Sequence, residues 1–358
     1  MCGAWTALTI WVGVVAAPPA SAGVRADFVG LAGEDVSIGD ADYRASALSD
    51  QARVGAGVVR LTFDWSRMEP EPGVYDLSAY DLEVAGAARA GVRLLPVIAI
   101  PPVFRQRRPQ RRARRGSYPP RPGEMAEFAA MLVRRYGPGG TLFEDRPDLP
   151  HRPIRSWQIW NEPNLRVYWQ PRPNARAYVR LLRTVGDAIE AVDPRAEIVS
   201  AGLPQSRQGV PFERFVNAMY RAGAKGTFDT LAVHPYARSE RGVIGAVRLA
   251  RRLTRRHRDG RRPIWVTEVG WSTGGPRSPF RAGMRGQAKR IRATLRGLAR
   301  RRKRLRVRGV VYYNWRDYPF EVPRSKDFFG LHTGLLRPNG RKKPGYFAFA
   351  RAARTLRR

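Results

Sequence analysis

Residues 154–164 read Ile-Arg-Ser-Trp-Gln-Ile-Trp-Asn-Glu-Pro-Asn, a short apolar run that ends in a polar segment interrupted by proline. The run predicts a buried strand over 154–160, and Pro163 marks its end, because proline cannot donate to a sheet ladder. A second stretch, 263–268 (Pro-Ile-Trp-Val-Thr-Glu), has the same form. Each run therefore places a carboxylate, Glu162 or Glu268, at the end of a predicted strand.

Outward from these two stretches, short apolar runs alternate with longer helical patterns along the chain. Strands are predicted at 26–31, 57–63, 92–98, 154–160, 196–201, 228–234, 263–268 and 307–313. Helices are predicted at 78–90, 123–136, 174–192, 211–223, 242–257, 282–302 and 344–356. This alternation is typical of repeated βα units, and eight strands favour a closed barrel over an open sheet. We predict an α/β fold, a (β/α)₈ TIM barrel, with one domain over 23–358.

The charge of the chain is strongly positive, with 65 Lys+Arg against 30 Asp+Glu and a formal net charge of +35. One interpretation is binding to nucleic acid or another anionic polymer, with the arginine-rich loop 105–115 as its centre. The other is the composition of a GC-rich genome. Because the arginines are spread along the whole chain, we favour the second interpretation and expect no specific nucleic-acid partner.

The first residues resemble a secretory leader. An apolar stretch at 4–17 precedes Ala20-Ser21-Ala22, which fits the small-residue pattern of a cleavage site. The stretch is too short for a comfortable membrane span, so we expect a signal peptide over 1–22, a secreted protein and no stable membrane anchor. An anchor or a buried first helix is the alternative. Cys2 is the only cysteine, so the mature chain would contain no disulfide.

Two carboxyl groups flanking one bond are what glycoside hydrolysis requires. The segments 160–164 (Trp-Asn-Glu-Pro-Asn) and 267–271 (Thr-Glu-Val-Gly-Trp) close the predicted fourth and seventh strands. On these motifs the chain resembles clan A of the glycoside hydrolases, whose catalytic glutamates follow strands four and seven. The segment from 136 to 164 is most similar to family 39-like and family 5-like bacterial glycosidases. The resemblance covers essentially the whole mature chain.

The resemblance implies a role for each matching residue. Glu162 would be the acid/base, Glu268 the nucleophile of a retaining enzyme, and Asn161 the hydrogen-bonding partner of the sugar 2-hydroxyl. For the two glutamates, a purely structural role at the strand ends is the alternative. A carboxyl separation near 5 Å would support retention, and one near 9 Å would indicate inversion.

Four further residues match supporting positions of the clan. Arg60 would hold the nucleophile ionised, because a nearby cation lowers the pKa of a carboxylate. Tyr236 would donate to Glu268, His234 would line the sugar pocket, and Trp315 would be the stacking platform beneath the reactive sugar. A structural salt bridge for Arg60, a buried pair for His234 and Tyr236, and core packing for Trp315 remain alternatives.

Three further features of the sequence concern substrate contacts and cofactors. Residues 100–103 (Ile-Pro-Pro-Val) stand where many family 5 enzymes place a histidine after strand three, which leaves substrate contacts there open. Trp65, Trp169 and Trp271 would form further subsites or pack in the core. None of the four histidines has metal-ligand spacing with another, so we expect no metal and no cofactor.

The sequence therefore predicts a secreted, monomeric glycoside hydrolase that cleaves O-glycosidic bonds of a polysaccharide or oligosaccharide by double displacement. An acidic polysaccharide is one candidate substrate, and the positive charge would permit association with a cell surface. The alternatives are a non-catalytic carbohydrate-binding barrel and an anionic-polymer-binding barrel. The sugar, the linkage and the choice between endo and exo cleavage stay open.

Overall fold

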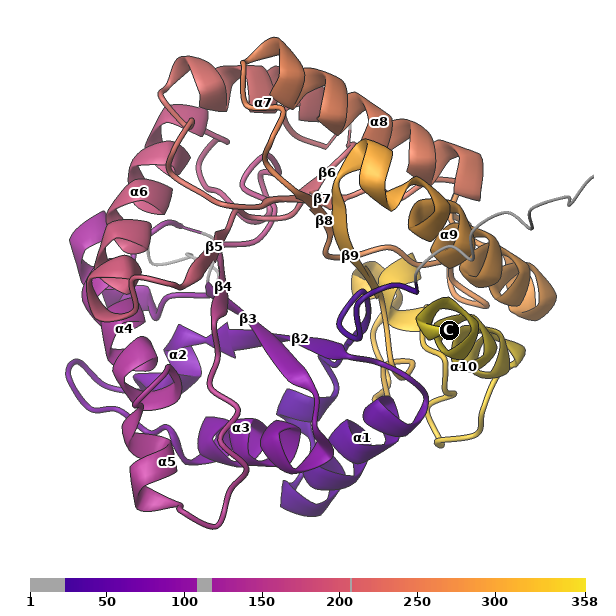
Figure 1. The fold of residues 1–358 in the computed structure, drawn as a ribbon, viewed down its shortest axis with the longest axis horizontal. Helices are drawn as coiled ribbons and strands as arrows, with labels where there is room; N and C mark the ends of the chain where they lie inside the picture. The colour runs from indigo at the N-terminus through magenta and orange to yellow at the C-terminus, as the bar shows by residue number, and fades with distance from the viewer. Residues whose placement is uncertain (1–22, 108–117, 207) are drawn as a thin grey trace, which may run out of the picture.

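The computed structural model describes residues 23–107, 118–206 and 208–358. In these residues the chain forms one parallel sheet of nine strands, with helices arranged around a ring of strands (Figure 1). The strands are β1 (Val29–Ala32), β2 (Val58–Asp64), β3 (Arg93–Ala99), β4 (Ser156–Ile159), β5 (Glu197–Val199), β6 (Leu203–Pro204), β7 (Leu231–His234), β8 (Ile264–Val266) and β9 (Val307–Tyr312). The helices are α1 (Ala41–Arg53), α2 (Trp65–Met68), α3 (Ser78–Ala90), α4 (Pro122–Tyr136), α5 (Thr141–Asp145), α6 (Ala175–Val192), α7 (Phe212–Arg221), α8 (Glu240–Arg256), α9 (Gly283–Leu305) and α10 (Pro344–Arg357).

The strands follow one another around the sheet in the order β5-β4-β3-β2-β1-β9-β8-β7-β6. The first and last strands of the chain thus lie side by side, with Gly30 paired to Val311. The longest register, between β2 and β3, runs from Val58↔Arg93 to Asp64↔Ala99. Because all the pairs are parallel, the carboxyl ends of the strands lie at one end of the sheet, where active sites of such folds form.

The strand count differs from the eight predicted because the expected fifth strand, 196–201, appears as β5 and a further short strand, β6, follows beyond the predicted range. β5 and β6 form the two ends of the strand order, yet only residues 200–202 separate them in the chain. Around this break the backbone makes isolated bridges, Val199 with Thr230 and Asn161 with Gly202, instead of a continuous ladder. The other seven predicted strands overlap the observed ones, and α1, α2 and α5 are additional to the predicted helices.

Two apolar clusters fill the fold. The smaller one takes a residue from each of seven strands and lies inside the ring: Ala32, Val58, Leu95, Val199, Ala232, Trp265 and Val311. The larger one occupies the space between strands and helices. Side chains therefore fill the interior, as in other barrels, and leave functional groups to the rims.

The ends of the described chain are fastened to each other. Val24 N donates to Leu356 O (2.8 Å), and the Arg357 guanidinium donates to Ala26 O (3.1 Å). Helix α10 thus anchors the approach to β1, and it also packs against α9 (Figure 1). The predicted leader 1–22 lies outside the described residues. Across the part of the chain that is described, no helix is long and apolar enough to cross a membrane.

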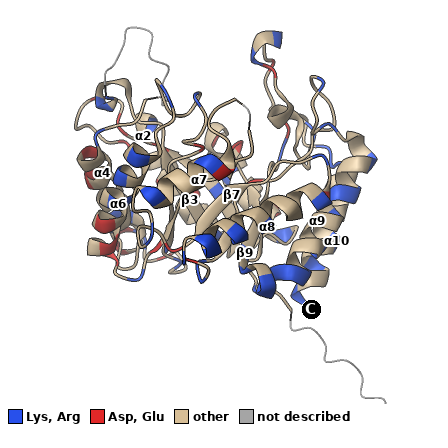
Figure 2. Cartoon of the chain, turned by 90° about the horizontal axis from the view of Figure 1, so that it is seen from above, with Lys and Arg blue, Asp and Glu red and all other residues tan. Residues whose placement is uncertain are grey.

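Basic residues are distributed over many helices and loops, with few acidic residues among them (Figure 2). The predicted arginine-rich loop 105–115 falls largely outside the described residues. Arg105, at its start, forms an ion pair with the buried Glu69 (2.6 Å). This arginine therefore has a structural role.

The packing between helices and strands predicts a large cost for truncating a buried helical side chain. Leu182 on α6 is fully buried, whereas Leu82 on α3 is 42% exposed. We expect Leu182→Ala to lower the free energy of unfolding by about 2–5 kcal/mol, because it leaves a cavity. Leu82→Ala should change it by less than about 1 kcal/mol. Urea unfolding followed by circular dichroism measures both, and equal losses would contradict this packing.

Candidate active site

Glu162 lies in a sharply turned segment directly after β4. The backbone is left-handed at Trp160 (φ 72°) and at Glu162 itself (φ 45°), a conformation uncommon outside glycine. Neighbouring strands hold the turn, since Trp160 N donates to Ile98 O (3.0 Å) and Glu162 N donates to Gly202 O (3.2 Å). Strain of this kind is found mainly where a side chain must be placed precisely.

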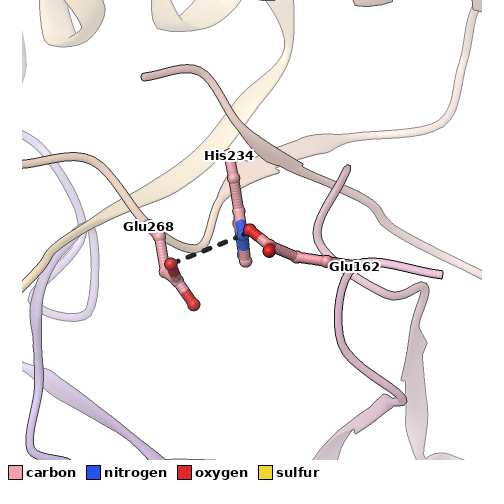
Figure 3. Close-up of side chains that lie close together, drawn as sticks. All are labelled: Glu162, His234 and Glu268. Carbon is pink, nitrogen blue, oxygen red and sulfur yellow. Dashed lines mark hydrogen bonds and ion pairs between the residues drawn. The ribbon is translucent and has the colours of Figure 1, made fainter. Parts of the chain in front are cut away.

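Glu162 and Glu268 approach each other at the carboxyl ends of β4 and β8. Both are buried, with 8% of each residue exposed. One carboxylate oxygen of each and a nitrogen of His234 all lie within 4.8 Å of one another (Figure 3). The two motifs that decide the predicted fold therefore meet at one place.

Arg60, from β2, connects this pair to the neighbouring strands. Its Nη1 lies 2.8 Å from Glu268 Oε1, its Nη2 donates to Asn161 Oδ1 (3.0 Å) and its Nε donates to Gln158 Oε1 (2.8 Å). Only 1% of Arg60 is exposed. A buried charge is tolerated when it is paired and hydrogen-bonded, and the geometry here supplies both conditions.

Tyr236, beyond the end of β7, contacts the same carboxylate from another side. Its hydroxyl donates to Glu268 Oε2 (2.7 Å). Glu268 is thus held by a cation on one oxygen and a hydroxyl on the other. Both contacts favour its ionised form.

His234 is buried between the two glutamates. Burial lowers the pKa of its imidazole well below the usual range, and Arg60 adds to the effect, so the ring is neutral. Its Nε2 lies 3.1 Å from Thr267 Oγ1, and its Nδ1 lies 2.7 Å from Glu162 Oε1. The ring is thus held from both nitrogens, with one of them in contact with the Glu162 carboxyl group.

The two carboxyl groups have different protonation tendencies. Burial raises the pKa of Glu162 well above its usual range, and the charge of Glu268 raises it further, with Arg60 in opposition. Burial also raises the pKa of Glu268, but the Arg60 guanidinium and the Tyr236 hydroxyl counteract it. Glu268 is therefore the group that ionises first, and Glu162 is the group that keeps its proton.

Glu34 and Tyr313 belong to the site although the sequence did not single them out. Glu34 follows β1; its Oε1 lies 3.6 Å from Arg60 Nη1, and its Oε2 accepts from Thr62 Oγ1 (3.0 Å). Tyr313 follows β9 and is half-buried; burial raises the pKa of its hydroxyl, and the charges of Glu34 and Glu268 add to this. The available signal was their position at or near the carboxyl end of a predicted strand, Tyr313 as the last residue of 307–313 and Glu34 three residues after 26–31.

Trp315 is not brought to the site. It is 1% exposed and packs against Tyr346, with ring centroids 6.1 Å apart, so its face is not open to a sugar. This placement corresponds to the core-packing alternative. The strand β9 ends at Tyr312, so the chain has already left the strand where Trp315 stands.

The three tryptophans expected near the rim are also buried. Trp65 stacks on Phe128 at 4.6 Å, Trp169 meets Trp160 edge to face at 5.5 Å, and Trp271 donates to Ala237 O (2.7 Å). They pack in the structure and do not present open faces.

Glu162, His234 and Glu268 are also the described residues whose ligand atoms are close enough to share a metal ion. Two carboxylates and an imidazole are suitable donors for zinc or iron. The Arg60 guanidinium, 2.8 Å from Glu268, occupies one of these oxygens and repels a second cation. The donor set therefore fits proton transfer better than metal binding.

Residues 145–301 match the family model described as the glycosyl hydrolase catalytic core. No curated protein matches the chain. Among solved structures, the chain is similar to a family 39 glycoside hydrolase from Bacteroides cellulosilyticus, with 19% identity, a TM-score of 0.68, and coverage of 92% of this chain and 64% of that one. It thus spans less than two thirds of that enzyme.

Two other solved structures agree with this fold. One is a family 39 β-xylosidase from Caulobacter crescentus, with 19% identity, a TM-score of 0.66, and coverage of 93% of this chain and 72% of that one. The other is a family 5 subfamily 18 enzyme from Streptomyces cattleya in complex with Manβ1-4GlcNAc, with 19% identity, a TM-score of 0.65, and coverage of 92% and 80%. The predicted resemblance is confirmed by the family-model match over residues 145–301 and by the similarity of fold.

The coupling between the two carboxyl groups can be tested by titration without any substrate. We expect Glu268→Gln to lower the pKa of Glu162, because it removes the negative charge that helps Glu162 keep its proton. Carbon-13 NMR of labelled glutamate carboxyl groups measures the shift. Glu213→Gln, on the exposed face of α7, is the control and should leave that pKa unchanged. An unchanged or higher pKa in Glu268→Gln would contradict the coupling.

Proposed function

We propose that this chain, which carries a glycosyl hydrolase catalytic core, cleaves O-glycosidic bonds with retention of configuration. The observation that carries the proposal is the buried pair Glu162–Glu268, in which one oxygen of each carboxylate lies within 4.8 Å of the other. Retaining enzymes have carboxyl groups about 5–5.5 Å apart, whereas inverting ones leave room for a water at roughly 6.5–9.5 Å.

The first step uses the different protonation states of the pair. Glu162 donates its proton to the leaving oxygen as the bond from that oxygen to the anomeric carbon breaks. Glu268 attacks the anomeric carbon and forms a glycosyl ester. Because His234 Nδ1 occupies Oε1 of Glu162, the proton for the leaving group resides on Oε2. Asn161, held by Arg60, is positioned to hydrogen-bond the sugar.

The second step returns both groups to their initial states. Once Glu268 is esterified its charge is lost, so the pKa of Glu162 falls and the residue becomes a base. Glu162 removes a proton from water, the water oxygen bonds to the anomeric carbon, and the ester bond to Glu268 breaks. Arg60 and Tyr236 stabilise the carboxylate that departs.

The proposed substrate is a β-linked glycoside of an oligosaccharide or polysaccharide. The similar structures include a β-xylosidase, an exo-β-1,4-mannosidase and a β-galactosidase. Tyr313 is the aromatic residue proposed to contact the reactive sugar in place of Trp315. An acidic polysaccharide is retained as a candidate because of the net charge of +35.

The complete architecture that we propose is a closed barrel of eight strands, in which β5 and β6 together count as the fifth strand. This is supported by their succession in the chain and by the bridge from Val199 to Thr230 beyond the end of β5. We further propose one catalytic domain over 23–358, secretion directed by residues 1–22, and a monomer. Signal-peptide mapping and sedimentation test the last two points.

The alternative function is binding without cleavage, by a barrel that binds either a carbohydrate or an anionic polymer. The different protonation tendencies of Glu162 and Glu268 argue against this alternative, because binding alone does not require a pair of carboxyl groups with different pKa values. Turnover in a glycoside screen distinguishes the two.

Substituting the nucleophile tests the catalytic assignment. On a panel of aryl β-xylosides, β-mannosides and β-galactosides, we expect Glu268→Ala to abolish turnover and added azide to restore it by replacing the missing carboxylate. Exposed Glu213→Ala is the control. Proton NMR of the first product should show the β-anomer. Undiminished activity in Glu268→Ala, or an α-anomeric first product, would overturn the proposal.

Substituting the acid/base gives an independent signature. We expect Glu162→Ala to slow hydrolysis by about 10²–10⁴-fold for poor leaving groups. The loss should be much smaller for 2,4-dinitrophenyl glycosides, whose leaving group needs no proton. The ratio of kcat/KM between the two leaving groups is the measurement. Equal losses for both would exclude Glu162 as the proton donor.

A further inference from the structure

A cavity of about 220 Å³ lies at the end of the barrel opposite to the carboxylate pair. Its lining includes Val58, Arg93 and Ser156, which are the first residues of β2, β3 and β4. Arg308, the second residue of β9, also lines it. The cavity is therefore formed by the amino-terminal ends of the same parallel strands.

Positive charge predominates around this cavity. Its described lining contains four arginines, Arg93, Arg152, Arg155 and Arg308, but one carboxylate, Asp27. Asp27 Oδ2 already receives Arg93 Nη1 (3.1 Å) and Arg308 Nη2 (3.0 Å). From outside the lining, Asp193 Oδ2 lies 3.5 Å from Arg155 Nη1, and Glu197 Oε1 lies 3.5 Å from Arg308 Nε. Among the described residues, Arg152 is therefore the lining arginine that has no carboxylate partner.

Two buried donors of the lining are unpaired. The Arg308 side chain is 10% exposed and Trp265 is 1% exposed. Within the described residues, neither Arg308 Nη1 nor Trp265 Nε1 has a hydrogen-bond partner. The guanidinium carbon lies 4.5 Å from the centre of the indole ring, so the two donors are neighbours. Both groups can only donate, and a buried donor without an acceptor is destabilising.

We propose that this cavity binds a tetrahedral oxyanion of the phosphate or sulfate class. Such an anion offers several acceptor oxygens and negative charge, which match the fork of a guanidinium. A water takes about 30 Å³ of liquid volume, so the cavity has room for a five-heavy-atom anion and some waters. The anion can be free or can be a substituent on a polymer, and the chemistry of recognition is the same.

The test is calorimetric titration of the full chain with inorganic phosphate, in a buffer free of other oxyanions and at fixed ionic strength. We expect saturable one-site binding that sodium chloride does not reproduce. Arg152→Gln, which breaks no ion pair, should weaken binding about tenfold, as loss of a charged hydrogen bond does. Arg308→Lys keeps the charge but removes the fork and should have a similar effect.

Arg214→Gln on α7 is the matched control, because it removes the same charge from an exposed position without a partner among the described residues. It should leave phosphate affinity unchanged. A sulfated dextran in a parallel titration distinguishes a polymer-borne group from the free anion. Absence of saturable phosphate binding would overturn the proposal. So would equal weakening by Arg152→Gln and Arg214→Gln, which would indicate a diffuse cationic surface.

Discussion

The buried contact between Arg60 and Glu268 is the interaction on which the rest of the site depends. A guanidinium that is 1% exposed is stable only if its charge and its donors are satisfied. Its partners are Gln158 on β4, Asn161 in the turn after β4, and Glu268 in the segment after β8. One side chain on β2 thus fixes the relative positions of strands that are distant in sequence. It also sets the protonation of the nucleophile candidate.

The protonation of Glu162 follows from the same contact. Because Arg60 and Tyr236 stabilise charge on Glu268, the proton shared by the coupled pair resides on Glu162. His234 is kept neutral by burial and contacts one oxygen of Glu162, which orients the acid without charging the site. Two glutamates in one cavity therefore acquire different functions from their surroundings, a pattern that recurs in acid–base catalysis.

Charges of opposite sign gather at the two ends of the barrel. Parallel strands bring carboxylates together at their carboxyl ends and arginines together at their amino ends. Active sites in this fold lie at the first end, whereas the second usually contributes stability. Asp27 and its arginines fit that structural role. Two donor atoms there, Arg308 Nη1 and Trp265 Nε1, have no partner among the described residues, and they are the basis of the proposed anion site.

Much of this arrangement could be predicted from the chain. The run 57–63 anticipates β2 to within one residue, and Glu162, Glu268, Asn161, Arg60, His234 and Tyr236 all meet at the predicted place. Strand-end residues are predictable because parallel strands share one direction. The position of Trp315 could not be predicted in this way. The strand β9 ends at Tyr312, and the alternation of side chains between the two faces of a strand does not extend into the loop that follows. The split of the fifth strand depends on bridges that have no local signal.

The sequence by itself determined the alternation of seven strands with the main helices, the positions of the two glutamates at strand ends and the excess of positive charge, because these depend on local hydropathy and residue identity. Only the tertiary structure decided which groups touch. The approach of the carboxylates, the contact of His234 with Glu162, the positions of Glu34 and Tyr313 at the site, and the cavity lined by Arg308 all depend on contacts between strands far apart in the chain. Burial and distance, which set pKa and pairing, exist only after the ring has formed.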